Sequence, residues 1–300
     1  MAADIAVLNS SLGLGETAHF VTGEGGLPKL QIASAAGSGE IYLHGAQVTS
    51  WKPAGDSEVL FTSQHSKWED GRAIRGGIPV CFPWFRGKAD NPQAPAHGVA
   101  RTRSWTPVEI VEQSGTVVAT FATESDASTL HWWPYPFRLA LRVAMGAELA
   151  LALTVTNTGD TPFSFEEALH TYHRVGDATQ IDVAGLAGVA FLDNTDGNAR
   201  KLQHGEVRLT GPTDNAYLDT ETRLVLHDPV LKRRLRIEKR NSRTTVVWNP
   251  WESGAKALAD LGDEEWRTMA CVEASNILSA AVTLAGGASH TMETIIAVME

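Results

Sequence analysis

Every second residue is apolar along much of this chain, and this alternation limits the possible folds more than any other property of the sequence. Because successive side chains of a β-strand point to opposite faces, the alternation over residues 137–155 predicts two strands with one buried and one wetter face. The turn between them falls at Gly146-Ala147, and residues 157–160 (Asn-Thr-Gly-Asp) end the second strand. The alternating apolar residues are Phe137, Leu139, Leu141, Val143, Met145, Leu149, Leu151, Leu153 and Val155.

Shorter runs of the same kind recur between Gly, Asn, Asp and Pro residues at intervals of roughly ten residues, a spacing typical of β-sandwiches and barrels. Their ranges are 40–51, 164–175, 206–210, 222–226, 234–239, 244–248, 268–273 and 280–284. Helix is scarce, and the best candidate is 255–261, where two leucines have helical spacing and a glycine follows. Neither a flexible linker nor an internal repeat divides the chain. We therefore predict an all-β protein with one large antiparallel β-sandwich domain over residues 1–300.

Composition excludes several classes of function. A formal net charge of -10 argues against nucleic acid and anionic membrane as partners, and an anionic substrate would need a local cluster of arginines. The N-terminal residues lack the pattern of a signal peptide, and no apolar stretch is long enough to span a bilayer. Cys81 and Cys271 lack metal-type spacing and are expected to be reduced and buried. We expect a cytoplasmic monomer with no metal site.

Residues 75–85 (Arg-Gly-Gly-Ile-Pro-Val-Cys-Phe-Pro-Trp-Phe) have a composition unsuited to regular structure. Pro79 and Pro83 lack an amide donor and fix φ, which disfavours helix and confines strand to edges. We expect an ordered loop that presents Arg75 beside aromatic rings. Further along, residues 97–101 (His-Gly-Val-Ala-Arg) add a histidine and a second arginine. The two segments together suit a sugar-binding or anion-binding pocket, although a proline-rich loop packed over a sheet edge has the same composition.

One candidate for acid–base chemistry lies in the predicted strand 163–173. Alternation places Glu166, His170 and Tyr172 on one face of this strand. A carboxylate, an imidazole and a phenol on one face are costly unless that face meets solvent or a substrate. The alternative is a solvated outer face or a histidine with a structural role.

A second candidate lies in the predicted strand 268–274. Glu273 shares its face with Met269 and Cys271, so its carboxylate is poorly solvated and its pKa should be raised. A raised pKa suits a general base that works near neutral pH. The alternative is a glutamate at the rim of the sheet, paired with a lysine or an arginine.

Two further segments contain side chains that a sugar pocket could use. Trp248 and Trp251 flank Asn249-Pro250, and their indoles could stack on a sugar face or fill the core. Residues 213–217 have a turn-like composition, and Asp214 there could contact a ligand or simply cap the turn.

These segments, in this order, resemble the hexose-6-phosphate mutarotases (glucose-6-phosphate 1-epimerases) of the aldose 1-epimerase superfamily. The matching motifs are residues 75–85, His97-Gly-Val-Ala-Arg101, Leu169-His-Thr-Tyr172, Trp248-Asn-Pro-Trp251 and Cys271-Val-Glu273. The likeness extends over about residues 37–299. It implies a galactose-mutarotase-like β-sandwich with its substrate on the concave face. It also implies conversion between the α and β anomers of a hexose 6-phosphate without a cofactor.

The resemblance implies roles for single residues as well. His170 would be the general acid and Glu273 the general base, so His170 should be protonated while Glu273 is ionised. Arg75 and Arg101 would hold the phosphate of the substrate, a small-molecule sugar phosphate. The other implied contacts are His97 and Asp214 with sugar hydroxyls, and Phe85, Trp248 and Trp251 as walls of the pocket.

Two positions depart from the family pattern. Val99 stands where relatives usually have Phe, and we expect it to loosen one wall of the pocket. Arg86 stands where relatives tend to have Gly, and we expect it to add a third cation or to change the shape of the loop. Two other functions stay open: an aldose 1-epimerase that acts on unphosphorylated sugars, and a carbohydrate-binding protein without catalysis.

Overall fold

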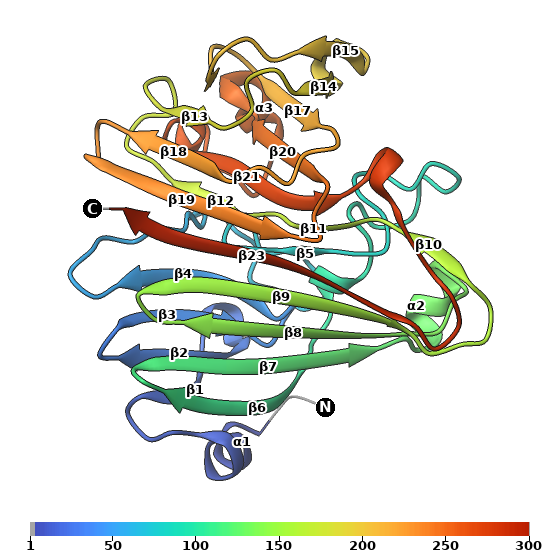
Figure 1. Ribbon diagram of the computed structural model, residues 1–300. Helices are drawn as coiled ribbons and strands as arrows, with labels where there is room; N and C mark the ends of the chain where they lie inside the picture. The colour runs from blue at the N-terminus through green and yellow to red at the C-terminus, as the bar shows by residue number, and fades with distance from the viewer. Residues whose placement is uncertain (1–3, 300) are drawn as a thin grey trace.

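The computed structural model describes residues 4–299 and consists mainly of antiparallel strands in two large sheets (Figure 1). The nine-stranded sheet contains, in spatial order, β16 (Val207–Arg208), β13 (Asp182–Ala184), β18 (Leu224–Asp228), β19 (Arg233–Arg240), β23 (Ser289–Met299), β9 (Glu148–Asn157), β8 (Phe137–Met145), β7 (Thr116–Glu124) and β6 (Thr106–Gln113). The eight-stranded sheet contains β15 (Ala199–Leu202), β14 (Ala190–Asp193), β17 (Thr213–Tyr217), β20 (Thr244–Asn249), β21 (Met269–Asn276), β11 (Glu167–Leu169) and β5 (Val80–Cys81), with β12 (Tyr172–Arg174) also paired to β21.

Smaller elements complete the structure. A four-stranded sheet is formed by β1 (Ala18–Thr22), β2 (Pro28–Ser34), β3 (Gly37–Tyr42) and β4 (Gln47–Pro53), and β10 (Phe163–Phe165) pairs with β22 (Val282–Leu284). The helices are α1 (Ile5–Leu12), which packs beside β1, α2 (Ala127–Trp132) and α3 (Trp251–Ala257), with short 3-10 turns between strands. No helix within residues 4–299 is long and apolar enough to cross a membrane.

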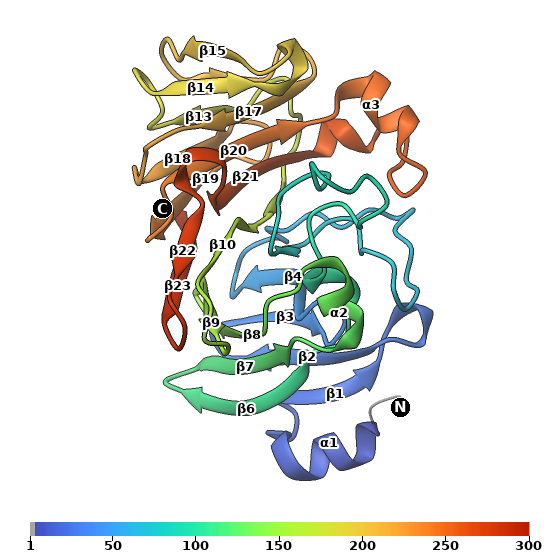
Figure 2. The ribbon, with the colours of Figure 1, turned by 90° about the vertical axis from the view of Figure 1, so that its right-hand side faces the viewer.

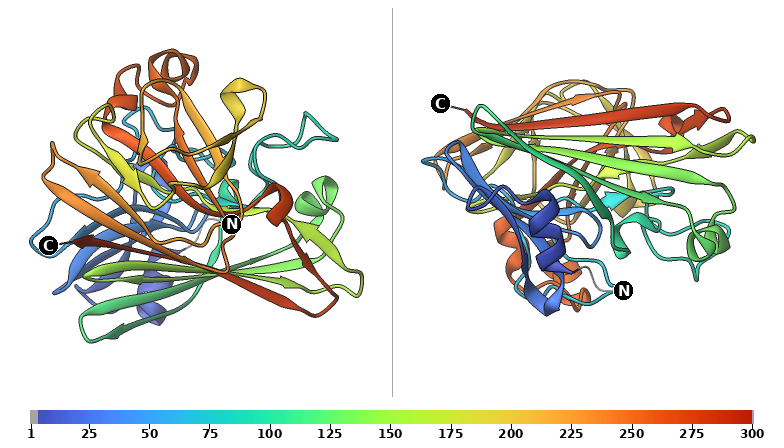
Figure 3. Two further views of the ribbon diagram at one scale, coloured as in Figure 1. Left: turned by 45° about the horizontal axis from the view of Figure 1, so that its top comes forward. Right: turned by 90° about the horizontal axis from the view of Figure 1, so that it is seen from below.

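The predicted hairpin lies inside the nine-stranded sheet, where β8 pairs with β9 and Leu141 lies opposite Leu153. Figure 3 shows these long strands side by side with β23. All apolar residues of the predicted face are buried, and burial of each such side chain contributes about 1.5–3 kcal/mol. The main core contains residues from Ala18 to Ile296. The single domain over residues 1–300 stays a prediction.

The two faces of the eight-stranded sheet have different surroundings. Val247, Val272 and Ala274 point into the main core, whereas the alternate residues Val246 and Glu273 point to the opposite face. Figure 2 shows the long loops between β4 and β6 next to this second face, below α3. A cavity between these loops and the sheet is therefore built from segments that lie far apart in the sequence.

The structure corrects several predicted elements. The run 40–51 is the two strands β3 and β4, because a turn with positive φ at Gly45 and Ala46 separates them. The segment 213–217 is strand β17 and not a turn. The predicted helix 255–261 overlaps α3 only at residues 255–257, because α3 begins at Trp251 and ends at Ala257. Before it, the Asn249 side chain accepts a hydrogen bond from the Trp251 amide.

The predicted strand 163–173 is broken into β10, β11 and β12. Glu166 leaves the sheet ladder, and its carboxylate accepts hydrogen bonds from the amides of Phe85 and Leu278. The second break falls at His170, whose amide donates to the carbonyl of Pro79 at 3.0 Å. The loop that contains Arg75 and the proline motif is thereby fastened directly to the residues around His170.

Candidate active site

A cavity of about 270 Å³ lies on the second face of the eight-stranded sheet. Strands β17, β20 and β21 supply one side, and the loops around residues 75–101 supply the other. The residues that line it are Arg75, Phe85, Arg86, Ala96, His97, Arg101, His170, Asp214, Val246, Trp248, Leu258 and Glu273. The structure thus brings together both predicted catalytic residues and all four predicted substrate-binding residues.

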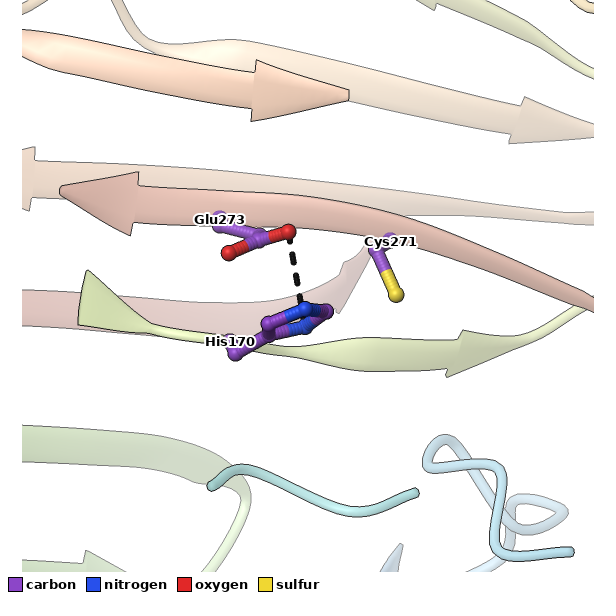
Figure 4. A group of neighbouring side chains, drawn as sticks. All are labelled: His170, Cys271 and Glu273. Atoms are coloured by element: carbon purple, nitrogen blue, oxygen red, sulfur yellow. Dashed lines mark ion pairs between the residues drawn. The ribbon is translucent and has the colours of Figure 1, made fainter. Parts of the chain in front are cut away.

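His170 and Glu273 face each other inside the cavity (Figure 4). The His170 Nδ1 and Glu273 Oε1 atoms are 3.4 Å apart, and both side chains are buried. Neither atom, nor Glu273 Oε2, has a hydrogen-bond partner within residues 4–299. The His170 ring stacks on Tyr172 with centroids 4.8 Å apart and planes at 12°. Polar atoms that are buried without partners point to a ligand that would satisfy them.

Burial drives both groups towards their uncharged forms. The pKa of His170 is held well below its usual value by loss of solvation and then by the positive charges of Arg101 and Arg75. Loss of solvation, followed by repulsion from Asp214, raises the pKa of Glu273 well above its usual value. The raised pKa of Glu273 agrees with the expectation from its strand.

The protonated His170 expected from the resemblance is therefore disfavoured in the empty cavity. The uncharged pair (imidazole and carboxylic acid) and the charged pair (imidazolium and carboxylate) contain the same number of protons. The two forms differ only in which residue carries one of these protons, and the low polarity of the site favours the uncharged pair.

This burial predicts a pH-dependent effect of Glu273→Gln on stability. The pKa of Glu273 is higher in the folded protein than in the unfolded chain. As the pH rises from the unfolded-state pKa towards the folded-state pKa, the unfolded chain releases this proton first, so wild-type protein loses stability. Glutamine does not titrate, so the variant should gain in Tm relative to wild type between pH 5 and pH 8. Each unit of raised pKa corresponds to about 1.4 kcal/mol. Calorimetry of both proteins across this range tests it, and a Tm difference that stays constant contradicts it.

Arg75 is already engaged within the protein. Its Nη2 donates to both carboxylate oxygens of Asp260 at 3.0 and 3.1 Å, and its Nη1 donates to the Tyr172 hydroxyl at 3.0 Å. The neighbouring Gly77 has φ of 61°, and a Cβ there would lie 2.1 Å from the carbonyl oxygen of Val48. Only glycine allows this approach, which seats the loop of Arg75 against β4.

Arg101 has more capacity for a ligand than Arg75. Its Nη2 donates to the Ala96 carbonyl at 2.9 Å, its Nε has no partner, and no carboxylate within residues 4–299 lies at ion-pair distance. A partly exposed guanidinium without a counter-ion among residues 4–299 is suited to bind an anion from outside.

His97 is a hydrogen-bond donor at the cavity. Its Nδ1 lies 3.3 Å from the Arg86 amide that donates to it, which leaves the ring proton on Nε2. Burial and then the charge of Arg101 hold the pKa of His97 well below its usual value, so the ring is neutral. A neutral ring with Nε2–H suits contact with a sugar oxygen.

Asp214 is fixed by two donors at the other end of the cavity. Arg86 Nη2 donates to its Oδ1 at 2.5 Å, and Asn194 Nδ2 donates to its Oδ2 at 2.7 Å. Arg86 is therefore a third cation at the cavity, but one with a carboxylate partner.

Two predicted wall positions need correction. Trp251 does not line the cavity, because it begins α3 and packs on Trp266 with ring centroids 4.3 Å apart. Val99 is buried in the main core and does not form a cavity wall, so its small size does not loosen the pocket. Phe85 and Trp248 do line the cavity, and the His170 ring lies 6.3 and 6.0 Å from them.

One group of side chains has the donor set of a metal site. A nitrogen of His170, the sulfur of Cys271 and an oxygen of Glu273 all lie within 4.8 Å of one another (Figure 4). Zinc accepts such ligands, but a metal here would occupy the two atoms that could transfer protons. The absence of a metal site stays a prediction.

Sequence reasoning missed two polar residues at the site, Asp260 and Asn194. Asp260 lies 185 positions from the arginine it pairs with, and Asn194 lies 20 positions from the aspartate it holds. Local patterns contain no signal for such pairs, because the partners meet only when the loops pack over the sheet.

A buried histidine–glutamate pair in a cavity of a large antiparallel β-sandwich is the kind of site in which an enzyme can transfer protons. The chain belongs to the aldose 1-epimerase family, which it matches over residues 28–297. A relative from Cenchrus ciliaris, which carries the provisional name glucose-6-phosphate 1-epimerase, is 36% identical over 270 residues, covering 85% of this chain and 80% of the relative.

Solved structures have the same fold. A crystal structure from Salmonella typhimurium, provisionally named as the mutarotase YeaD, superposes with a TM-score of 0.90 at 28% identity and covers 96% of each chain. A galactose mutarotase-like protein from Clostridium acetobutylicum superposes with a TM-score of 0.72 at 14% identity, over 94% of this chain and 98% of that one. The predicted galactose-mutarotase-like fold is thereby confirmed.

Proposed function

We propose that the protein is a cofactor-independent isomerase that interconverts the α and β anomers of a hexose 6-phosphate, with glucose 6-phosphate as the first candidate. The observation that carries the proposal is the pair of His170 and Glu273, 3.4 Å apart in a cavity that Arg101 and Arg75 also line. The facing atoms of this pair have no hydrogen-bond partner in the described part of the chain. The provisional name of the 36% identical relative supports the substrate class.

The reaction needs one base and one acid that act on neighbouring oxygens of the sugar. Glu273 accepts the proton of the C1 hydroxyl while His170 donates a proton to the ring oxygen, and the bond between C1 and the ring oxygen breaks. Rotation about the C1–C2 bond turns the other face of the aldehyde towards the C5 hydroxyl. His170 then takes the proton of that hydroxyl, Glu273 returns its proton to the C1 oxygen, and the other anomer closes.

Ring opening converts an imidazolium and a carboxylate into an imidazole and a carboxylic acid. That is the uncharged pair that burial favours, so the site stabilises the open-chain stage of the reaction. Each positioned acid or base typically contributes about 10²–10⁴-fold to the rate.

The phosphate of the substrate would assist the first step. The C6 phosphate is close to the ring oxygen in the sugar, so it belongs at the His170 end, where Arg101 and Arg75 lie close enough to lower the pKa of His170. A bound phosphate neutralises these arginines and weakens their repulsion of an imidazolium. The proton then moves more readily from Glu273 to His170. His170 becomes the protonated acid, and Glu273 becomes the ionised base. Arginine suits this role because its planar fork binds two oxygens at once.

The remaining cavity residues have roles in holding the sugar. The Nε2–H of His97 and the carboxylate of Asp214 would contact hydroxyl groups, and the rings of Phe85 and Trp248 would bound the sugar. Because one chain supplies the whole cavity, we also propose that the enzyme works as a monomer, in the cytoplasm, where its two buried free cysteines stay reduced.

A coupled assay tests the function. Fresh α-glucose 6-phosphate is supplied to a β-specific glucose-6-phosphate dehydrogenase, in parallel with α-glucose and a β-specific glucose dehydrogenase. We expect added protein to accelerate the first reaction well beyond the second. Acceleration of free glucose alone would assign the protein as an aldose 1-epimerase for unphosphorylated sugars. Acceleration of neither would favour a carbohydrate-binding protein.

A further inference from the structure

Arg75 and Arg86 bond to residues at the two ends of one row of side chains on the eight-stranded sheet. Strand register places Tyr172, Cys271, Trp248 and Asp214 in one row across β12, β21, β20 and β17. Neighbouring strands are about 4.8 Å apart, so the two ends of this row are separated by about 14 Å. Arg75 bonds to Tyr172 at one end, and Arg86 bonds to Asp214 at the other. The partners of Arg75 and Arg86 are therefore far apart along this row, although the charges of Arg86 and Arg101 both act on Glu273.

The backbone of Arg86 is in a conformation that residues with a Cβ avoid. Its φ is 60°, in the left-handed region, where glycine is favoured. The peptide of His97 accommodates this turn, since the His97 amide donates to the Arg86 carbonyl at 2.7 Å. An observed outlier of this kind beside a functional cavity indicates that the side chain has a task there.

The guanidinium of Arg86 acts on two carboxylates. Its Nη2 donates to Oδ1 of Asp214, while Asn194 Nδ2 donates to Oδ2, so the position of the Asp214 carboxylate is fixed. Arg86 also lies close enough to Glu273 to lower the pKa of that carboxyl, whereas the negative charge of Asp214 raises it. The charged and titratable groups around Glu273 are Asp214 on β17, Cys271 on β21, His170 between β11 and β12, and Arg86 and Arg101 on the loops.

We propose that Arg86 is a positioning residue, which fixes Asp214 as a charged hydrogen-bond acceptor at the Glu273 end of the cavity and offsets the repulsion between these two carboxylates. Without Arg86, the Asp214 charge would be uncompensated, and Glu273 would keep its proton to a higher pH. Arg86 would then contribute to the base and not to the phosphate site. This inference rests on the proposed function, because only that function makes Glu273 a base.

The first test follows the titration of Glu273 itself. With ¹³C-labelled glutamate, we expect the Glu273 carboxyl to titrate at higher pH in Arg86→Gln than in wild type. In Arg86→Lys, the titration of Glu273 should return most of the way to the wild-type pH range. The acid limb of kcat/KM for glucose 6-phosphate should move in the same direction, with kcat/KM lower by about 10-fold or more. An unchanged Glu273 titration in Arg86→Gln would overturn the proposal. Because the titration needs no turnover, it decides this point even if the wild-type protein proves inactive.

The second test separates Arg86 from the phosphate site. Calorimetric binding of inorganic phosphate should weaken less than threefold in Arg86→Gln. A loss of tenfold or more would make Arg86 a third phosphate ligand and overturn the proposal. Arg243→Gln is the matched control, because it removes an arginine from an exposed pair with Asp219 at 2.7 Å, away from the cavity lining, and should change neither readout. Arg86→Gly suits the left-handed backbone, so it should keep the wild-type Tm while it reproduces the Arg86→Gln effects.

Discussion

We expect Glu273→Gln to lower kcat for the anomerisation of glucose 6-phosphate by about 10²–10⁴-fold. Glutamine keeps the shape of the side chain but cannot accept the proton of the C1 hydroxyl. Since Glu273 is fully buried and the site already favours its uncharged form, the substitution should not destabilise the fold. The coupled assay at saturating substrate measures the effect, and calorimetry confirms that the variant is folded.

His170→Asn should lower kcat for glucose 6-phosphate by a similar factor, because asparagine cannot donate a proton to the ring oxygen. The two residues act in one proton exchange, so the double variant should lose little more than either single variant. Losses that multiply in the double variant would show that the two residues act independently. Activity that persists in either folded single variant would remove that residue from the mechanism.

We expect Arg101→Met to raise KM for glucose 6-phosphate by about 10- to 150-fold, the factor that corresponds to the roughly 1.5–3 kcal/mol of a hydrogen bond to a charged group. Arg101 has no internal counter-ion within residues 4–299, so a bound phosphate would be its main electrostatic partner. Methionine retains most of the length of the side chain without its charge. Steady-state kinetics with glucose 6-phosphate and with glucose measure the two values of KM, and that for glucose should not rise.

Arg103→Met provides the control for this effect. Arg103 is two positions away, and its Nη2 pairs with Asp126 at 2.6 Å outside the cavity lining. Its loss should leave KM for both sugars unchanged. If Arg101→Met impairs both sugars equally, Arg101 shapes the cavity and does not bind phosphate.

Those parts of the fold that depend on local alternation could be predicted from the sequence. The buried face of β8 and β9 follows directly from the period of two, as does the placement of Glu273 on a face opposite to Val272. α1 was not predicted, although Ile5, Leu8 and Leu12 have helical spacing and pack, partly buried, against the main core. α2 also has a readable signal, the capping box between Asp126 and Thr129, although its apolar face is too short to stand out.

The candidate site could be predicted only in part, for a related reason. His170 and Glu273 lie in recognisable motifs, but the break of the strand at His170 depends on contacts with Pro79 and on the departure of Glu166 from the ladder. The pairs of Arg75 with Asp260 and of Arg86 with Asp214 join residues 185 and 128 positions apart. Long-range pairs of this kind are set by the packing of loops over the sheet and not by any local pattern.

The position of β21 in the sheet has a consequence for the dynamics of the site. β21 is bonded to β20 on one side and to β11 and β12 on the other, so the backbone around Glu273 has neighbours on both edges. Amide hydrogens in such a strand exchange with solvent only through an opening that approaches global unfolding. We therefore expect the backbone amides around Glu273, the proposed base, to be among the slowest to exchange in the molecule. Adjustments during substrate entry and release are expected in the loops over the sheet and not in the strand that carries Glu273.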